Sequence, residues 1–153
     1  MLNPHYISGF VDGEGCFSVS FNKNGERLPE VRLIFEIELR EDDEPILREI
    51  KEVLGCGNIY RLEYERYAQW QPHVKLKVSN FGDISQKVIP FFQKYPLKAK
   101  KRHDFEKFCQ VAELIKTKRH LTADGIEQIR KIKHGDSLDA LDAHVQWGAT
   151  EAI

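Results

Sequence analysis

Alternating apolar and polar residues near the start of the chain predict two paired β-strands. Residues 17–22 place Phe or Val at every second position, and residues 30–39 repeat the alternation over a longer run. A period of two is typical of a strand that buries one face and exposes the other. The dipeptide Asn24-Gly25 between the two runs is a strong signal for a tight turn. We therefore expect an antiparallel hairpin with one apolar face.

Helical signals lie on both sides of this hairpin. Asn3-Pro4 supplies a cap and a first-turn proline, which predicts a short helix over about residues 4–11. A second helix should begin near residue 42 or 43, where acids occupy the first turn, and should end at Gly55. Both helices are placed to cover the apolar face of the hairpin.

Two more strands and three more helices complete the predicted pattern. Residues 58–65 and 71–78 have the composition and alternation of strands. The three helices should begin at Ser79, near residue 100 and at Thr122. This order favours an α+β fold in which one four-stranded antiparallel sheet carries helices on one face, with extra helices at the C-terminal end.

The uncovered face of the predicted sheet is polar and holds the candidates for ligand binding. It is rich in hydroxyl, amide and aromatic side chains rather than in paired charges. β-Ribbons can enter the major groove of DNA and read base edges, although an ordinary solvated sheet face would also be polar. The candidate DNA-binding residues are Ser18, Ser20, Asn22, Asn24, Arg32, Tyr60, Gln71, His73, Lys75 and Lys77.

Charge is distributed unevenly along the chain. The 153 residues carry a net charge of −1, which argues weakly against a DNA-binding protein. Residues 134–153 hold four acids and no Lys or Arg, so residues 1–133 carry +3. We therefore expect one domain over residues 1–133 and an acidic tail, a candidate for disorder, over residues 134–153. Five Lys and Arg side chains cluster within residues 94–102, which suits phosphate binding or simple solvation.

The cysteines and the hydropathy pattern bear on location. Cys16, Cys56 and Cys109 have neither disulfide-scaffold nor zinc-site spacing. This predicts an intracellular, reducing compartment, such as a bacterial or archaeal cytoplasm or an organelle. No apolar run approaches the length of a membrane span and no signal peptide is visible, so we expect no membrane partner.

The stretch from Tyr6 to Phe17 ends a predicted helix in two closely spaced acids. Asp12 and Glu14 lie between glycines where the free carbonyl oxygens of a helix end already carry partial negative charge. Carboxylate and carbonyl oxygens together suit a hard cation such as Mg²⁺. The alternative is a helix that ends in glycine with two solvated acids, and the spacing alone does not separate these interpretations.

This stretch resembles the signature of the LAGLIDADG homing endonucleases, many of which carry L-A-G-F-V-D-G-[DE]-G. The match is complete over residues 9–15 and departs at Ile7 and Ser8. The predicted order of elements also resembles the family over about residues 1–133, which implies a saddle-shaped sheet over DNA. In this family a single copy of the motif implies a homodimer. The interface residues implied by the resemblance are Ser8, Gly9, Val11 and Asp12.

The resemblance also implies a chemistry: cleavage of both strands of a long pseudo-palindromic DNA target by metal-dependent phosphodiester hydrolysis. By position, Glu14 is the metal-binding acid and Gly13 offers its carbonyl, whereas Asp12 is a weaker ligand candidate and a better supporting residue. Mg²⁺ is the expected cofactor, with Mn²⁺ able to substitute and Ca²⁺ binding without cleavage. The catalytic lysine of the family fits Lys100, with Lys98 second; the alternative for either is a phosphate clamp without catalytic duty.

One departure from the family pattern leaves part of the site unexplained. The Gln and Arg that order water near the metal in well-known members fall here near Leu39 and Asp43, and Arg40 is out of register. Two other functions stay open, a DNA-binding regulator that does not cut and an intron maturase that binds RNA. Glu14 disfavours the regulator, because a protein that only binds gains nothing from an acid beside a phosphate. An intron-encoded endonuclease is therefore the favoured function.

Overall fold

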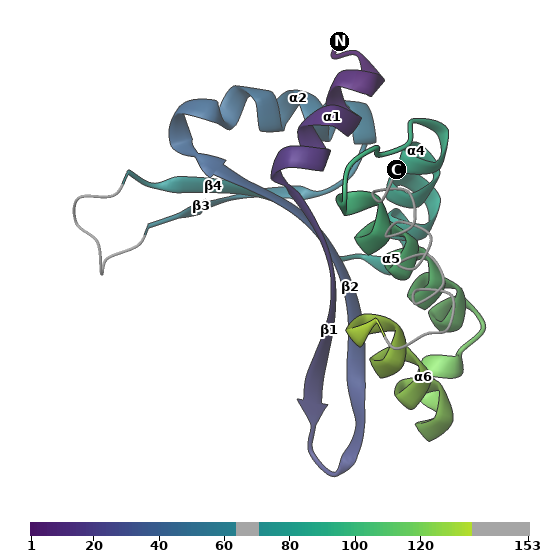
Figure 1. Ribbon diagram of the computed structural model, residues 1–153. Helices are drawn as coiled ribbons and strands as arrows, with labels where there is room; N and C mark the ends of the chain where they lie inside the picture. The colour runs from purple at the N-terminus through teal and green to yellow at the C-terminus, as the bar shows by residue number, and fades with distance from the viewer. Residues whose placement is uncertain (64–70, 136–153) are drawn as a thin grey trace, which may run out of the picture.

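The computed structural model describes residues 1–63 and 71–135. In chain order the elements are α1 (Pro4–Glu14), β1 (Gly15–Asn24), β2 (Arg27–Arg40), η1 (Glu41–Asp43), α2 (Glu44–Leu54), β3 (Asn58–Leu62), β4 (His73–Val78), α3 (Phe81–Asp83), η2 (Ile84–Val88), α4 (Ile89–Lys94), α5 (Lys101–Lys116), η3 (Arg119–Leu121) and α6 (Ala123–His134). Figure 1 shows the helices gathered on one side of a strongly curved sheet whose other side is open. The predicted α+β fold is confirmed.

The sheet has four strands in the order β1-β2-β4-β3, and all neighbouring strands are antiparallel. β2 pairs with β1 along most of its 14 residues but with β4 only over residues 35–40. The β1–β2 hairpin therefore extends beyond the β3–β4 pair, as Figure 1 shows. This leaves a long two-stranded ribbon at one end of the open face.

Aromatic side chains hold the helices against the covered face of the sheet. Phe17 of β1 lies at the centre, with ring centroids 5.0 Å from Phe35, 5.2 Å from Phe105 and 5.2 Å from Phe108. Aromatic pairs at such separations add about 0.5–1.5 kcal/mol each beyond the area that they bury. These contacts fix α5 on β1, and α5 also contacts α1.

Three predicted helix boundaries are confirmed by their caps. The Asn3 side chain accepts a 2.8 Å hydrogen bond from a backbone N–H of the first turn of α1. Gly55 ends α2 with a φ of 73°, a left-handed conformation that favours glycine. Thr122 caps α6, because its hydroxyl accepts a 3.0 Å hydrogen bond from the N–H of Gly125.

The segment after β4 differs from the single helix that was expected from Ser79. Asn80 is the cap instead, and its side chain accepts a 3.0 Å hydrogen bond from the N–H of Asp83. The helix then widens into the π-helical turn η2 before α4. Pro90 has no N–H for the carbonyl of Gln86 four residues earlier, so a regular α-helix would leave that carbonyl unpaired.

Two predictions concern residues outside the described part of the chain. The end of the third predicted strand falls on residues 64–65, and most of the acidic tail falls on residues 136–153. Within residues 1–63 and 71–135, no helix is both long enough and apolar enough to cross a membrane.

Candidate functional site

Glu14 lies at the junction between α1 and β1. It is the last residue of α1, and β1 begins at Gly15 with no linker between them. α1 thus runs three residues beyond its predicted end at Val11. A Cβ at Gly15 would lie 2.6 Å from Val11 Cγ1, so this tight junction requires glycine. Gly13 and Glu14 are exposed, and the partial negative charge of the helix end makes this a place for a cation.

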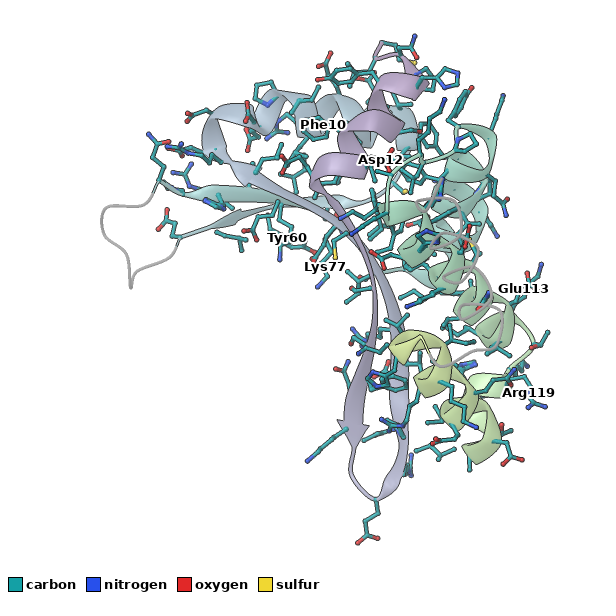
Figure 2. The ribbon with its side chains drawn as sticks, in the orientation of Figure 1. Phe10, Asp12, Tyr60, Lys77, Glu113 and Arg119 are labelled. Carbon is teal, nitrogen blue, oxygen red and sulfur yellow. The ribbon has the colours of Figure 1, made fainter. Side chains whose placement is uncertain are left out.

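Asp12 has a different environment from Glu14, although only one residue separates them. Its two carboxylate oxygens accept hydrogen bonds from the backbone N–H groups of Lys98, at 2.8 Å, and Ala99, at 3.1 Å. Figure 2 shows Asp12 on the side of α1 that faces this segment. Because both oxygens are engaged within the chain, the geometry favours the supporting role for Asp12 and disfavours its role as a metal ligand.

Three lysines lie at the start of α5 or just before it. Lys98 and Lys100 precede α5 and are exposed, whereas Lys101 is the first residue of α5 and is partly buried. The charge of Lys101 acts on the Cys16 thiol at the start of β1. Burial raises the pKa of that thiol, Glu36 raises it further, and Lys101 lowers it. Lys101 therefore joins the predicted Lys100 and Lys98 as a candidate for the lysine of the site.

Helical periodicity carries a signal for Lys101 that the sequence prediction missed. Lys101 precedes Phe105 by four residues and Phe108 by seven. Both phenylalanines pack against Phe17 of β1. Residues at these spacings share one face of a helix, so Lys101 extends the stripe of α5 that faces β1.

One face of α1 belongs to the core of its own chain. Ile7, Ser8 and Val11 are buried, and the Ser8 hydroxyl donates a 2.6 Å hydrogen bond to the carbonyl of Tyr95. This corrects the predicted interface, because Ser8 and Val11 are packed inside the chain and cannot face a partner. Of the predicted interface residues, Gly9 lies on the exposed face.

The exposed face of α1 is smooth and apolar. Gly9 and Gly13 lie one turn apart, and apart from the neighbouring backbone of α1 itself no atom lies within 4 Å of the position of a Cβ at either. Tyr6 and Phe10 share this face and stack with ring centroids 6.2 Å apart. Glycines one turn apart allow another helix to approach closely. This face of α1 is therefore suited to contact with a second helix.

The open face of the sheet carries eight of the ten predicted DNA-binding residues. Strand register brings together on this face Ser18, Ser20, Asn22, Arg32, Tyr60, His73, Lys75 and Lys77. Figure 2 shows Tyr60 and Lys77 on the concave side of the sheet. Asn24 lies at the hairpin tip beyond a shift in register, and Gln71 precedes β4. The predicted face therefore exists, with these two residues at its margins.

Acids on β2 pair with cations on β4 at the centre of this face. Lys75 Nζ lies 3.4 Å from Glu36 Oε2 and 3.6 Å from Glu38 Oε1. His73 Nδ1 lies 3.1 Å from Glu38 Oε2. We name Glu36, Glu38, His73 and Lys75 the central charge cluster. Lys77, by contrast, forms no ion pair with any residue of 1–63 or 71–135.

The positions expected to order water near a metal have other roles. Leu39 is buried in the core, and Asp43 ends the short helix η1. Arg40 is exposed and donates a 2.8 Å hydrogen bond from Nη2 to Gln71 Oε1. This Arg–Gln pair lies at the end of β2, three residues beyond Ile37, the residue that pairs with Gly15 beside Glu14. Arg40 and Gln71 are thus engaged with each other at the end of β2.

Comparison with known families identifies this combination of helix, acids and sheet. A family model described as LAGLIDADG endonuclease matches residues 7–112. The chain belongs to the LAGLIDADG endonuclease family. The predicted resemblance is thereby confirmed, and it extends well beyond the motif at residues 9–15.

Two fungal relatives have names that refer to introns. "Probable intron-encoded endonuclease 3" of Neurospora crassa is 34% identical over 129 residues, which are 84% of this chain and 23% of the relative. "Uncharacterized cox1 intron-2 37.2 kDa protein" of Schizosaccharomyces pombe is 32% identical over 131 residues, 85% of this chain and 37% of the relative. The chain thus spans between about a quarter and two fifths of these relatives.

Solved LAGLIDADG structures share the fold closely. Meganuclease I-SmaMI bound to uncleavable DNA superposes with a TM-score of 0.80 at 30% identity, covering 89% of this chain and 45% of that chain. I-GzeII in complex with its DNA target gives a TM-score of 0.76 at 32% identity, over 88% and 44% of the two chains. The chain therefore spans less than half the length of each.

Proposed function

We propose that this chain is a site-specific homing endonuclease that cuts both strands of a long, pseudo-palindromic DNA target. The observation that carries the proposal is Glu14, an exposed acid at the end of α1 and directly before the open sheet. An acid at this helix end is unfavourable unless a cation accompanies it. The similar meganuclease I-SmaMI has been solved bound to cleaved DNA.

Two copies of the fold supply the two cuts. We infer a homodimer in which the α1 helices pack through Gly9 and Gly13, the exposed glycines with room for a neighbouring backbone. A two-fold axis between the helices brings the two Glu14 carboxylates together and aligns the two open sheets along one duplex. Such a dimer requires a target with matching two-fold symmetry.

A divalent metal fits the donors at this junction. The Glu14 carboxylate and the Gly13 carbonyl would hold it, and oxygen donors of this kind suit Mg²⁺ or Mn²⁺. No three of the His, Cys, Asp and Glu side chains among the described residues form a metal site, so DNA phosphates and the second copy would complete the ligands. I-SmaMI has been solved on uncleaved DNA with calcium ions, in keeping with Ca²⁺ binding that does not support cleavage. A bound Mg²⁺ would acidify water and neutralise charge on the phosphate.

The remaining residues position the DNA and stabilise charge. Lys101 is placed to stabilise negative charge that develops on the scissile phosphate. Asp12 fixes the segment before Lys101 to the end of α1 through its bonds to Lys98 and Ala99. The open sheet presents hydrogen-bonding side chains to the major groove.

We infer the compartment from the names of the relatives and from the cysteines. Cys16, Cys56 and Cys109 are all free thiols, and burial raises the pKa of each, that of Cys109 to about 11. Relatives are named for ND4 and cox1 introns. We infer that the protein works in a reducing compartment inside the cell or organelle that carries its intron.

The test is cleavage of the uninterrupted insertion site. The DNA flanking the gene defines this site once the interruption is removed, and a duplex of that sequence should be cut on both strands when Mg²⁺ is added. Replacement of Mg²⁺ by Ca²⁺ should leave the duplex bound and intact. Tight binding of this duplex without any cleavage in Mg²⁺ or Mn²⁺ would overturn the enzyme proposal and favour the non-cutting regulator.

A further inference from the structure

The central charge cluster is the most shielded group of ion pairs among the described residues. Its four side chains are between 25% and 34% exposed. Every other ion pair in that part of the chain has a partner at least 46% exposed, as in the Arg32–Glu30 pair on the same face. Salt screens partly buried pairs of this kind less than it screens exposed ones.

The cluster lies on the two inner strands of the sheet. Glu38 is directly opposite Lys75 and Glu36 is directly opposite Lys77 in the register of β2 with β4. Lys75 reaches both acids, so one ammonium group serves two carboxylates. The cluster thus holds two acids around one lysine, which is unusual on a surface that must approach phosphates.

Two acids are unfavourable on a face that attracts DNA by charge alone. A carboxylate that meets DNA without a donor is repelled by phosphates and loses its water, which disfavours binding. The amino group of cytosine, however, is a donor in the major groove, and Glu is a suitable acceptor for it. Beside it, guanine presents two acceptors that suit Lys or a His N–H. The cluster places an acceptor and a donor side by side, in the arrangement that a G·C pair requires.

We propose that the central charge cluster reads a G·C base pair in each half of the target and weakens binding to other sequences; this rests on the proposed function. Glu38 accepts a hydrogen bond from the cytosine amino group while Lys75 donates to the guanine edge. An A·T pair also presents an amino donor, adenine N6, but that donor lies between two acceptors, adenine N7 and thymine O4, whereas in G·C the donor lies beside the two acceptors of guanine. The adjoining acceptor and donor of Glu38 and Lys75 match the order in G·C, and at other pairs Glu38 holds Lys75 away from phosphates. The cluster therefore determines specificity more than affinity.

The experiment compares base preference in the wild type and in Glu38→Gln. Each protein, with Ca²⁺ to prevent cleavage, selects from a library of duplexes with randomised sequence, and the recovered duplexes give the preference at every base pair. Affinity for one fixed duplex of unrelated sequence is then measured over a range of salt. Glu30→Gln is the matched control, because Glu30 is also on β2, on the same face and paired with an Arg at 3.3 Å.

We expect the wild type to prefer G·C at one position in each half-site by about tenfold or more. Glu38→Gln should lose that preference at that position alone. It should bind the unrelated duplex more tightly and with a steeper salt dependence, because the variant removes from this face one negative charge that repels phosphates. Glu30→Gln should keep the preference. If Glu38→Gln is unfolded in a thermal melt, Lys75→Gln serves instead and should lose the same preference while weakening binding.

Three results would overturn the proposal in distinguishable ways. An unchanged base preference in the folded variant would leave the cluster with a structural role only. Equal changes in Glu38→Gln and Glu30→Gln would show a general effect of charge rather than readout. If the wild type binds no duplex in the library, the proposed function is wrong, and so is the role proposed for the cluster.

Discussion

The same four strands form both faces of the sheet, but the positions of the side chains on each face have different causes. On the covered face, Phe17 and Phe35 pack among aromatic rings of α4 and α5, and their positions follow from a simple alternation. On the open face, the chemistry depends on which residue of β4 lies opposite which residue of β2. Burial therefore specifies the fold locally, whereas the functional surface arises from pairing between distant segments. Substitutions on each side should separate stability from activity.

The largest effect on cleavage should come from Glu14→Gln, at the point where α1 passes into β1. Loss of the carboxylate removes the proposed metal ligand, so cleavage of the insertion-site duplex should fall below detection while affinity in Ca²⁺ changes little. Removing a negative charge from a helix C-terminus should also stabilise the fold by about 0.3–1 kcal/mol. Glu113→Gln on the exposed side of α5 is the control and should cut normally. Normal cleavage by Glu14→Gln would mean that another group holds the metal.

On the covered face, Phe35→Ala should act through stability. Phe35 is fully buried beside Phe17 and Phe92, and truncation of such a ring typically lowers the free energy of unfolding by about 3–5 kcal/mol. Chemical denaturation measures this directly. Ile34→Ala, one residue away on the open face, should cost far less. Similar losses at the two positions would contradict the division of roles between the faces.

Lys101→Met tests the lysine that we propose for the site. Loss of one group that stabilises transition-state charge typically lowers the rate by about 10²–10³-fold. We expect a fall of this size in the rate of single-turnover cleavage, with little change in duplex affinity. Lys100→Met and Lys98→Met carry the same change of charge and should retain most activity. A larger loss at Lys100 would restore that residue as the catalytic lysine.

Asp12→Asn probes the connection between α1 and the segment before α5. An Asn side chain can accept only one of the two backbone hydrogen bonds and presents its NH₂ to the other donor. We expect a loss of about 1–3 kcal/mol in the free energy of unfolding, measured by denaturation, together with slower cleavage because Lys101 is less well placed. Asp124→Asn, an exposed acid in the first turn of α6, should have a much smaller effect. Unchanged stability would show that the connection is weak.

The smallest effect should come from Lys77→Gln. Lys77 has no ion pair within the described chain, so it can bind a phosphate without leaving a partner. Its loss should weaken duplex binding uniformly across sequences and reduce the salt dependence by about one counterion. Lys75→Gln should not behave in this uniform way, because Lys75 is held by two acids. Equal salt slopes in the two variants would show that the central charge cluster opens freely on DNA.

Sequence patterns predicted what depends on near neighbours in the chain. The caps at Asn3 and Thr122 and the alternation in β1 and β2 are local, and all were found. The hairpin predicted from Asn24-Gly25 was found too, with Gly25 and Glu26 as its two turn residues. Ser8 failed as an interface residue because a motif match does not show which side of a helix faces the core. That question needs the helical phase relative to Ile7 and Val11.

Features that join distant segments escaped prediction. The hydrogen bonds that Asp12 accepts from Lys98 and Ala99 span 86 and 87 residues, and no sequence pattern predicts them. The partners of Lys75 on β2 require the exact offset between two strands that are not adjacent in sequence. Lys101 is an intermediate case, since its phase relative to Phe105 was visible but was outweighed by its neighbours Lys98 and Lys100.

Because Glu14 ends α1 and Gly15 begins β1, the distance from Glu14 to each residue of β1 is fixed. A strand advances about 3.3 Å per residue and duplex DNA about 3.4 Å per base pair. If β1 follows the groove, Ser18, Ser20 and Asn22 meet base pairs roughly four, six and eight steps from the point of cutting. Because no linker separates α1 from β1, an insertion or deletion at the start of β1 should shift the cut relative to the sequence that is read.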